Sequence, residues 1–279
     1  MSRIFIMNNT TGSIVDKNGV VLDEKSIGYM IWAANVMLPR LAKAWNGICP
    51  RVVYYTGQYQ PTAQDWQFHI INEDPKNPGA EAYHTEENAV IDGYILAKTI
   101  VDNGGFILSD VSISNNPGID EVHVHGSTES TVAGALFHEL AEALLDDTVN
   151  GWWQSDQPLT IIHATGSSQS QQTFSNGMTL CCSEICDPVQ QNFVVIKCGT
   201  VDIALSDFIL PAWKDNQNKT GPYNYINTLK TPFTVDLGGY VVIMDSNGNS
   251  QQVFSDKIPE TIKDYKKKSY RANKRDLHF

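Results

Sequence analysis

The stretch from Phe137 to Asp147 constrains the fold more than any other part of the chain, because it places one imidazole and four carboxylates on about three turns of an expected helix. Each helical residue advances about 100°, so His138 and Glu142 lie one turn apart on one face. Asp146 continues that row, and Glu139 lies at its edge, where it could hold a water on a metal. The His-Glu-x-x-Glu pattern predicts that His138 and Glu142 bind one metal ion.

Apolar residues in the same stretch indicate that this helix is buried. The stripe consists of Phe137, Leu140, Ala141, Leu144 and Leu145. Such a stripe is typical of a helix that packs against a core. Unpaired buried charges are costly, so the imidazole and the carboxylates of a buried helix need a partner, and a cation would be one. The alternative interpretation of the motif is a solvated, charged helix face without a metal.

Downstream, the segment from Cys181 to Pro188 supplies two further carboxylates next to a chain-turning proline. Glu184 is the predicted third metal ligand. Asp187 is either an alternative ligand or the acceptor for the second ring nitrogen of His138, an arrangement that commonly orients metal-binding histidines. Asp146 is a candidate for the same two roles.

The cysteines are interpreted mainly as buried apolar thiols. Their number is odd, at five, which favours free thiols in a reducing compartment. A Cys-rich zinc site is the competing interpretation. Cys182 and Cys186 with a lone Cys198 do not form the paired Cys-x-x-Cys knuckles that such a site usually has.

Periodicity elsewhere predicts a mixed α+β fold. A helix is expected over residues 24–45, with Pro39 kinking or dividing it. Alternating or β-branched residues predict strands over 51–56, 66–71, 93–101, 193–196, 201–204 and 239–244. The Ser-, Gln- and Thr-rich stretch 151–177 is expected to be a loop.

Size and composition favour one large globular domain. With 279 residues, 42% of them hydrophobic, the chain can bury a full core. We expect a single domain over residues 1–256, with the helix motif in its N-terminal part, 1–150, and the third ligand in its C-terminal part, 178–256. No signal peptide or membrane-spanning run is apparent, which favours a cytoplasmic protein without membrane contacts.

Charge is unevenly distributed along the chain. Residues 257–279 hold eight of the 20 Lys and Arg against three acidic residues, so this basic tail carries +5 while the remainder carries −16. An acidic body argues against nucleic-acid binding except through the tail. A solvated terminus is the simpler interpretation of the tail.

Several motifs together resemble a little-characterised family of zincin-like proteins, predicted metallopeptidases of bacteria and some viruses. The corresponding stretches are 82–84 (Ala-Tyr-His), 92–94 (Asp-Gly-Tyr), 138–146 (the helix), 184–187 (Glu-Ile-Cys-Asp), 207–213 (Asp-Phe-Ile-Leu-Pro-Ala-Trp), 231–233 (Thr-Pro-Phe) and 238–240 (Gly-Gly-Tyr). The likeness spans about residues 80–245. Asp147 departs from the family pattern, in which Pro usually follows the aspartate, and the insertion before Glu184 is long.

The resemblance implies a zincin-like fold, in which an active-site helix packs beneath a twisted mixed sheet whose edge strand faces the substrate. If the site is that of a metallopeptidase, His138, Glu142 and Glu184 would hold Zn²⁺, and Glu139 would act as the general base in peptide-bond hydrolysis.

Tyr83 and His84 are candidate substrate or oxyanion contacts for such an enzyme. Another metal-dependent hydrolase, such as an amidase, would share the site.

Ligand charge leaves the metal and the activity open. Two carboxylate ligands neutralise Zn²⁺ and weaken its effect on a bound water, and oxygen-rich sites also suit Ca²⁺, Mg²⁺ or Mn²⁺. The alternative function is a non-catalytic, zincin-fold structural or particle-associated protein that assembles with copies of itself, with a structural metal or none. Such a scaffold has no need of Glu139.

Overall fold

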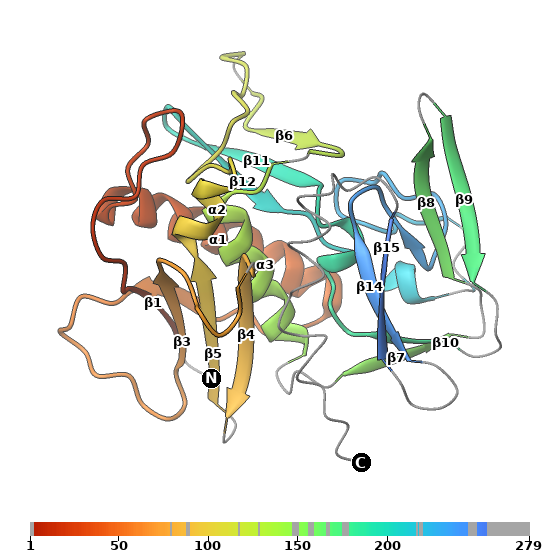
Figure 1. The fold of residues 1–279 in the computed structure, drawn as a ribbon, viewed down its shortest axis with the longest axis horizontal. Coiled ribbons are helices and arrows are strands. Elements are labelled where there is room, and N and C mark those ends of the chain that lie inside the picture. Colours follow the sequence, from red (N-terminus) through yellow and green to blue (C-terminus); the bar gives the residue numbers. More distant parts are fainter. Residues whose placement is uncertain are drawn as a thin grey trace.

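The computed structural model describes residues 3–255 except for 79, 88–89, 117, 128, 147–150, 156–158, 166–167, 175–178, 216, 218–219 and 245–249. The basic tail and Asp147 therefore lie outside the described residues. The fold mixes α-helices with strands in several sheets, as predicted (Figure 1).

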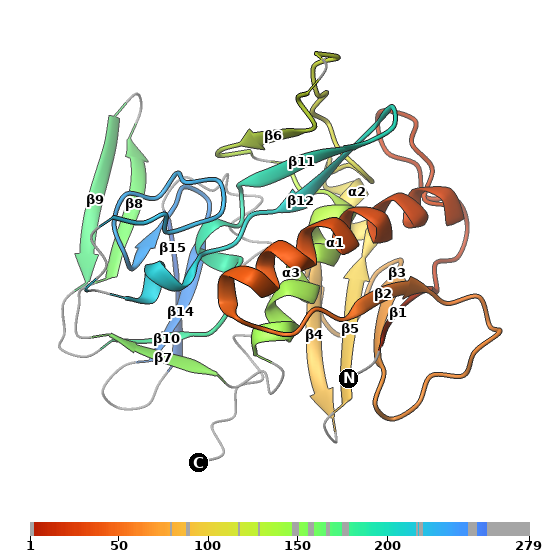
Figure 2. The same ribbon diagram turned by 180° about the vertical axis from the view of Figure 1, so that it is seen from behind.

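A five-stranded sheet forms one outer layer of the fold. Its strands, in spatial order, are β2 (Arg51–Tyr54), β1 (Arg3–Asn8), β3 (Trp66–Ile71), β5 (Val90–Leu96) and β4 (Ala82–Glu87). The first four run parallel, and β4 closes one edge antiparallel to β5. Helices α1 and α3 contact this sheet, with α3 against β4 and β5 (Figure 2).

Helix α1 (Glu24–Trp45) matches its predicted bounds. It begins at a capping box, in which the Asp23 carboxylate accepts a hydrogen bond from the Ser26 amide and the Ser26 hydroxyl accepts one from the Asp23 amide. The predicted division at Pro39 does not occur. Met37, Leu38 and Leu41 around it are at most 1% exposed, and burying them outweighs the cost of about 3 kcal/mol for proline inside a helix.

Helix α3 (Val132–Leu145) lies between the five-stranded sheet and a second, antiparallel sheet (Figure 2). That sheet comprises β12 (Val201–Ser206), β11 (Phe193–Cys198) and β6 (Glu121–Val124). The Thr131 hydroxyl caps α3 by accepting a hydrogen bond from the Gly134 amide, and it donates another to the carbonyl of Ala204. Together these two hydrogen bonds fix the start of α3 against β12.

Two predictions of secondary structure were wrong. The strand predicted over 93–101 ends at Leu96, and a short helix, α2 (Ala97–Asp102), follows. The predicted loop over 151–177 contains β7 (Trp152–Ser155), β8 (Leu159–Thr165) and β9 (Ser168–Phe174). β8 and β9 pair with each other over their whole length, so polar composition here reflects a paired ribbon rather than a loop.

Two further sheets form the C-terminal side of the fold (Figure 1). One orders β15 (Ser250–Phe254), β14 (Tyr240–Met244), β10 (Thr179–Cys182) and β7; the other orders β13 (Thr234–Val235), β8 and β9. After β10, the chain passes through a 3-10 turn at Asp187–Val189 before entering β11. Among the described residues, none of the helices is long and apolar enough to cross a membrane.

Candidate metal centre

Helix α3 places the His-Glu-x-x-Glu motif inside the protein. Every residue from Val132 to Ala143 is buried. His138 is 7% exposed, Glu139 3% and Glu142 0%. The solvated-face interpretation of the motif is therefore wrong, and the burial of these ionisable groups calls for close partners.

His138 contacts two carboxylates through one ring nitrogen. Its Nε2 lies 3.1 Å from Glu142 Oε1 and 3.2 Å from Asp187 Oδ1. Ligands on one tetrahedral zinc, with bonds of about 2.0–2.1 Å, lie about 3.3 Å apart. Asp187 is 1% exposed, and its Oδ2 has no hydrogen-bond partner among the described residues. This spacing suits residues that hold one cation between them.

The same contacts control the protonation of His138. Burial disfavours the imidazolium, but the charges and hydrogen bonds of Glu142 and Asp187 outweigh burial and raise the pKa of His138 well above its ordinary value. In the metal-free protein, a proton on this ring supplies the positive charge between the two carboxylates. A divalent cation would supply more positive charge at the same place.

The segment after β10 runs antiparallel to α3. This direction determines which residues of the segment contact the His-Glu-x-x-Glu motif. The Cys186 amide donates a hydrogen bond to Glu142 Oε1 over 3.2 Å. Glu184, in contrast, shares a buried group with Asp146 and Cys182, whose ligand atoms lie within 4.8 Å of one another. The structure thus groups Glu184, the predicted third ligand, with Asp146, which lies about two helical turns after His138.

Cys186 is a functional candidate that the sequence analysis interpreted as a buried apolar thiol rather than as a ligand beside His138. One ligand atom each of His138, Glu142 and Cys186 lie within 4.8 Å of one another. Burial, followed by the nearby charges of Glu142 and Asp187, raises the pKa of the Cys186 thiol well above its ordinary value. The available signal was its position next to Asp187, but the direction of the segment along α3 is not visible in the sequence.

His84 belongs to the site through Glu139. Its Nδ1 lies 2.8 Å from Glu139 Oε2, and it comes from the antiparallel edge strand β4. His84 is only 1% exposed, so in this conformation it orients Glu139 rather than facing solvent. One ligand atom each of His84, Glu139 and Glu142 also lie within 4.8 Å of one another.

Tyr83 is not brought to this site. Successive strand residues face opposite sides of a sheet, so Tyr83 points away from α3 where its neighbour His84 points toward it. The Tyr83 hydroxyl donates a hydrogen bond to Asp74 over 2.8 Å, and its ring stacks on Tyr94. Burial and the Asp74 carboxylate raise the pKa of Tyr83. Tyr83 therefore stabilises the outer face of the sheet.

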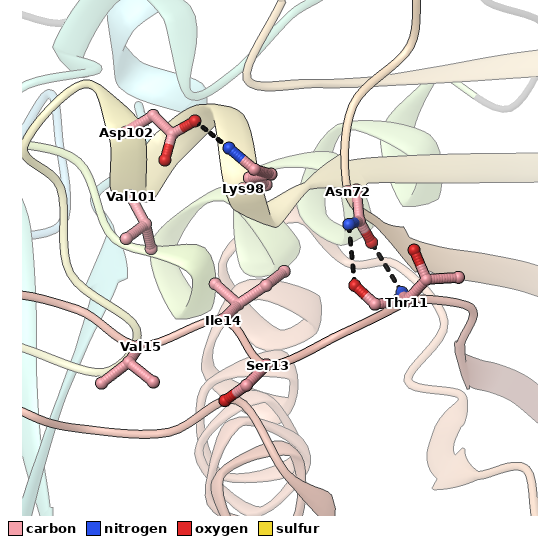
Figure 3. Close-up of a pocket in the computed structure, with 8 residues that line it drawn as sticks. All are labelled: Thr11, Ser13, Ile14, Val15, Asn72, Lys98, Val101 and Asp102. Atoms are coloured by element: carbon pink, nitrogen blue, oxygen red, sulfur yellow. Dashed lines mark hydrogen bonds and ion pairs between the residues drawn. The ribbon is translucent and has the colours of Figure 1, made fainter.

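Two hollows among the described residues differ in whether they reach the site. A small one of about 20 Å³ is lined by Glu81, Ser130, Thr131, Gly134, Ala135, His138, Gln190, Phe193 and Ser206. This volume suits about one water molecule. A larger one of about 150 Å³ lies between the segment 11–15, Asn72 and α2, where Lys98 pairs with Asp102 (Figure 3). Of these two, the small hollow is the one that reaches the motif, at His138.

Comparison with known proteins adds no further constraint: the chain matches none of the protein-family models, curated proteins or solved structures with which it was compared.

Proposed function

We propose that this protein is a zinc-dependent metallopeptidase in which His138 and Glu142 hold the metal and Glu139 is the general base. The observation that carries the proposal is the position of His138 Nε2, at 3.1 and 3.2 Å from two buried carboxylate oxygens. The third ligand is assigned to the pair Cys186 and Asp187, because Cys186 groups with His138 and Glu142 and Asp187 contacts His138, whereas Glu184 groups with Asp146 and Cys182.

The residues present fit a divalent cation. They offer an imidazole nitrogen, carboxylate oxygens and a thiol, all of which are zinc ligands. The oxygen of Asp187 that has no partner among the described residues supports the same assignment. When bound, zinc would act as a Lewis acid and acidify a coordinated water.

Glu139 is suited to the proton transfers of peptide hydrolysis. Its carboxylate follows His138 in the helix and is held by His84 at 2.8 Å. Fixed in this way, Glu139 would accept the proton of the attacking water and pass it to the leaving amine. Catalysis requires that the carboxylate keep one orientation, and His84 provides it.

The layer arrangement supports a zincin-like fold as part of the proposal. An antiparallel edge strand, β4, borders a mixed sheet, and α3 packs against β4 and β5. This is the arrangement that the resemblance implies for an active-site helix beneath a sheet. One of the segments that carry the resemblance, 238–240, also lies here, since Gly239 packs closely on the carbonyl of Pro188, next to Asp187.

Burial favours a second candidate, a structural metal in a non-catalytic scaffold. His138, Glu139, Glu142 and Asp187 are each at most 7% exposed. The hollow beside His138, about 20 Å³, is too small for a peptide. A peptide would need the described residues around the motif to move apart, whereas a structural ion needs no such movement.

Metal content and peptide hydrolysis, measured on the same variants, test the proposal. We expect about one zinc per chain in the wild type and in Glu139→Gln, and a loss of zinc with lower thermal stability in Glu142→Ala. Glu139→Gln should lose about 10²- to 10⁴-fold in hydrolysis of a mixed peptide library. Glu129→Gln, which alters a partly exposed carboxylate paired with Lys17, is the matched control and should change neither.

The outcomes separate the two candidates. Zinc without hydrolysis in the wild type would overturn the peptidase and favour the scaffold. Failure of the wild type to bind zinc, even after zinc is added, would overturn the metal centre itself. Zinc retained at full occupancy in Glu142→Ala would overturn the ligand assignment.

A further inference from the structure

Cys186 lies where a metal at the motif would meet a sulfur atom. Its side chain is completely buried, and one ligand atom each of Cys186, His138 and Glu142 lie within 4.8 Å of one another. The backbone fixes this position, because the Cys186 amide donates to Glu142 Oε1 and its carbonyl accepts from the Val189 amide. The amide bond ties Cys186 to α3, and the thiol donates a weak hydrogen bond to the His138 carbonyl over 4.0 Å.

A second observation indicates that this group suits a cation. Asp187, the next residue, is 1% exposed, and its Oδ2 has no hydrogen-bond partner within the described ranges. A buried carboxylate oxygen without a donor is costly. The other oxygen of Asp187 already contacts His138, so the unsatisfied atom belongs to the same cluster as Cys186.

We infer that the Cys186 thiolate is the third protein ligand of the metal, which makes the centre selective for zinc over calcium, magnesium and manganese. This inference rests on the proposed function. On ligation, the S–H bond breaks, the proton passes to solvent, and the sulfur lone pair forms the bond to the cation. Thiolates select soft or borderline metals, whereas Ca²⁺, Mg²⁺ and Mn²⁺ prefer oxygen.

A thiolate ligand is compatible with hydrolysis. His138, Glu142 and Cys186 supply three protein ligands, and catalytic zinc sites commonly keep three protein ligands and one open position. Cys186 groups with both His138 and Glu142, whereas the contact of Asp187 is with His138. The inference therefore assigns the third ligand position to sulfur.

X-ray absorption at the zinc edge of the zinc-loaded, full-length chain tests the inference without an activity assay. The wild type should show one sulfur at about 2.3 Å besides nitrogen and oxygen at about 2.0–2.2 Å. Cys186→Ser should lose the sulfur signal and weaken zinc binding by at least about 10-fold. Zinc should also outcompete a large excess of calcium in the wild type.

Two matched variants locate the sulfur even if Cys186→Ser does not fold. Cys182→Ser alters the thiol of the separate group with Asp146 and Glu184. Cys181→Ser alters an equally buried thiol whose pKa burial raises to about 12. Both variants should retain the sulfur signal if it comes from Cys186.

Each outcome has one meaning. Zinc bound through nitrogen and oxygen alone would overturn the inference, leave the proposed function standing and make Asp187 the third ligand. Loss of the sulfur signal in Cys182→Ser would overturn the inference, because the metal would then lie beside Asp146 and Glu184. No zinc binding at all would overturn both proposals.

Discussion

His84 and Glu139 form a buried pair, and its contribution to stability depends on the presence of both side chains. Their side chains are 0% and 4% exposed, and the contact between them is 2.8 Å. Removing one partner deprives the other buried polar group of this contact, and breaking a buried pair in this way costs more than the pair itself contributes. The pair therefore holds Glu139 in place, and the loss of His84 would destabilise the folded state.

We predict that His84→Ala lowers the free energy of unfolding by about 3 kcal/mol, since a buried carboxylate loses its imidazole partner. His123→Ala makes the same substitution at a histidine that is 45% exposed and pairs with Glu121, so it should cost less than about 1 kcal/mol. Urea unfolding of both variants measures the difference. Equal losses would mean that the His84 contact does not hold Glu139.

For single residues, the sequence indicated the helix residues and Asp187 as a partner of His138, but it did not indicate that Cys186 lies beside them. The spacing of His138 and Glu142 is local, so helical geometry alone places them together. Glu184 and Asp187 were harder to distinguish, because that choice depends on the direction in which their segment crosses α3. Asp187 and Cys186 meet the motif, and Glu184 meets Asp146.

At the scale of elements, glycines show where the backbone has room and where it has none. Gly28 lies on the exposed face of α1, and a Cβ there would meet nothing within 4 Å. A Cβ on Gly239 would lie 2.3 Å from the carbonyl oxygen of Pro188, which is backbone and cannot move aside cheaply. The close approach of Gly239 fixes the turn that carries Asp187.

We predict opposite effects for the same substitution at these two positions. Gly28→Ala should raise the free energy of unfolding by about 0.5–1 kcal/mol, because alanine favours a helix interior. Gly239→Ala should lower the free energy of unfolding by about 1–3 kcal/mol through overpacking. It should also weaken zinc binding, because it displaces the turn that carries Cys186 and Asp187. Chemical denaturation checks both signs. Stabilisation by Gly239→Ala would contradict the close packing of Gly239 on Pro188.

Elements with strong local signals were predictable, and those fixed by pairing were not. The bounds of α1 and β3 follow from periodicity and capping. Half of the α2 residues, Thr99, Ile100 and Val101, are β-branched, so composition could not separate this segment from the preceding strand. β8 and β9 are stabilised as strands by pairing with each other, and such contacts between segments leave little trace in local composition.

At the scale of the whole molecule, the site combines parts that are distant in the sequence. β4 supplies His84, α3 supplies the motif, and the turn after β10 supplies Cys186 and Asp187. The second antiparallel sheet covers α3 on the side away from the five-stranded sheet. This three-layer arrangement buries the motif. The apolar stripe indicated that burial, whereas the grouping of Cys186 with His138 and Glu142 depends on how distant segments meet.

One long-range ion pair ties the end of β6 to the C-terminal part, and it should make stability depend on pH. The Asp236 hydrogen bond raises the pKa of His125 above 6.5 despite partial burial. Burial alone would raise the pKa of Asp236, but contacts with His125 and Asn192 lower it overall. Both groups are therefore charged in the folded state between the lowered pKa of Asp236 and the raised pKa of His125.

We predict that the stabilisation from His125 is fully present below pH 6.5, its ordinary pKa, and is lost as pH rises through its raised folded-state pKa. Because the His125 side chain is 40% exposed, screening limits this change to less than about 1 kcal/mol. Unfolding of the wild type and of His125→Gln, measured from about pH 6 to about pH 9, should show a steeper decline in the wild type. Parallel curves would mean that the pair contributes nothing to joining β6 with the segment around Asp236.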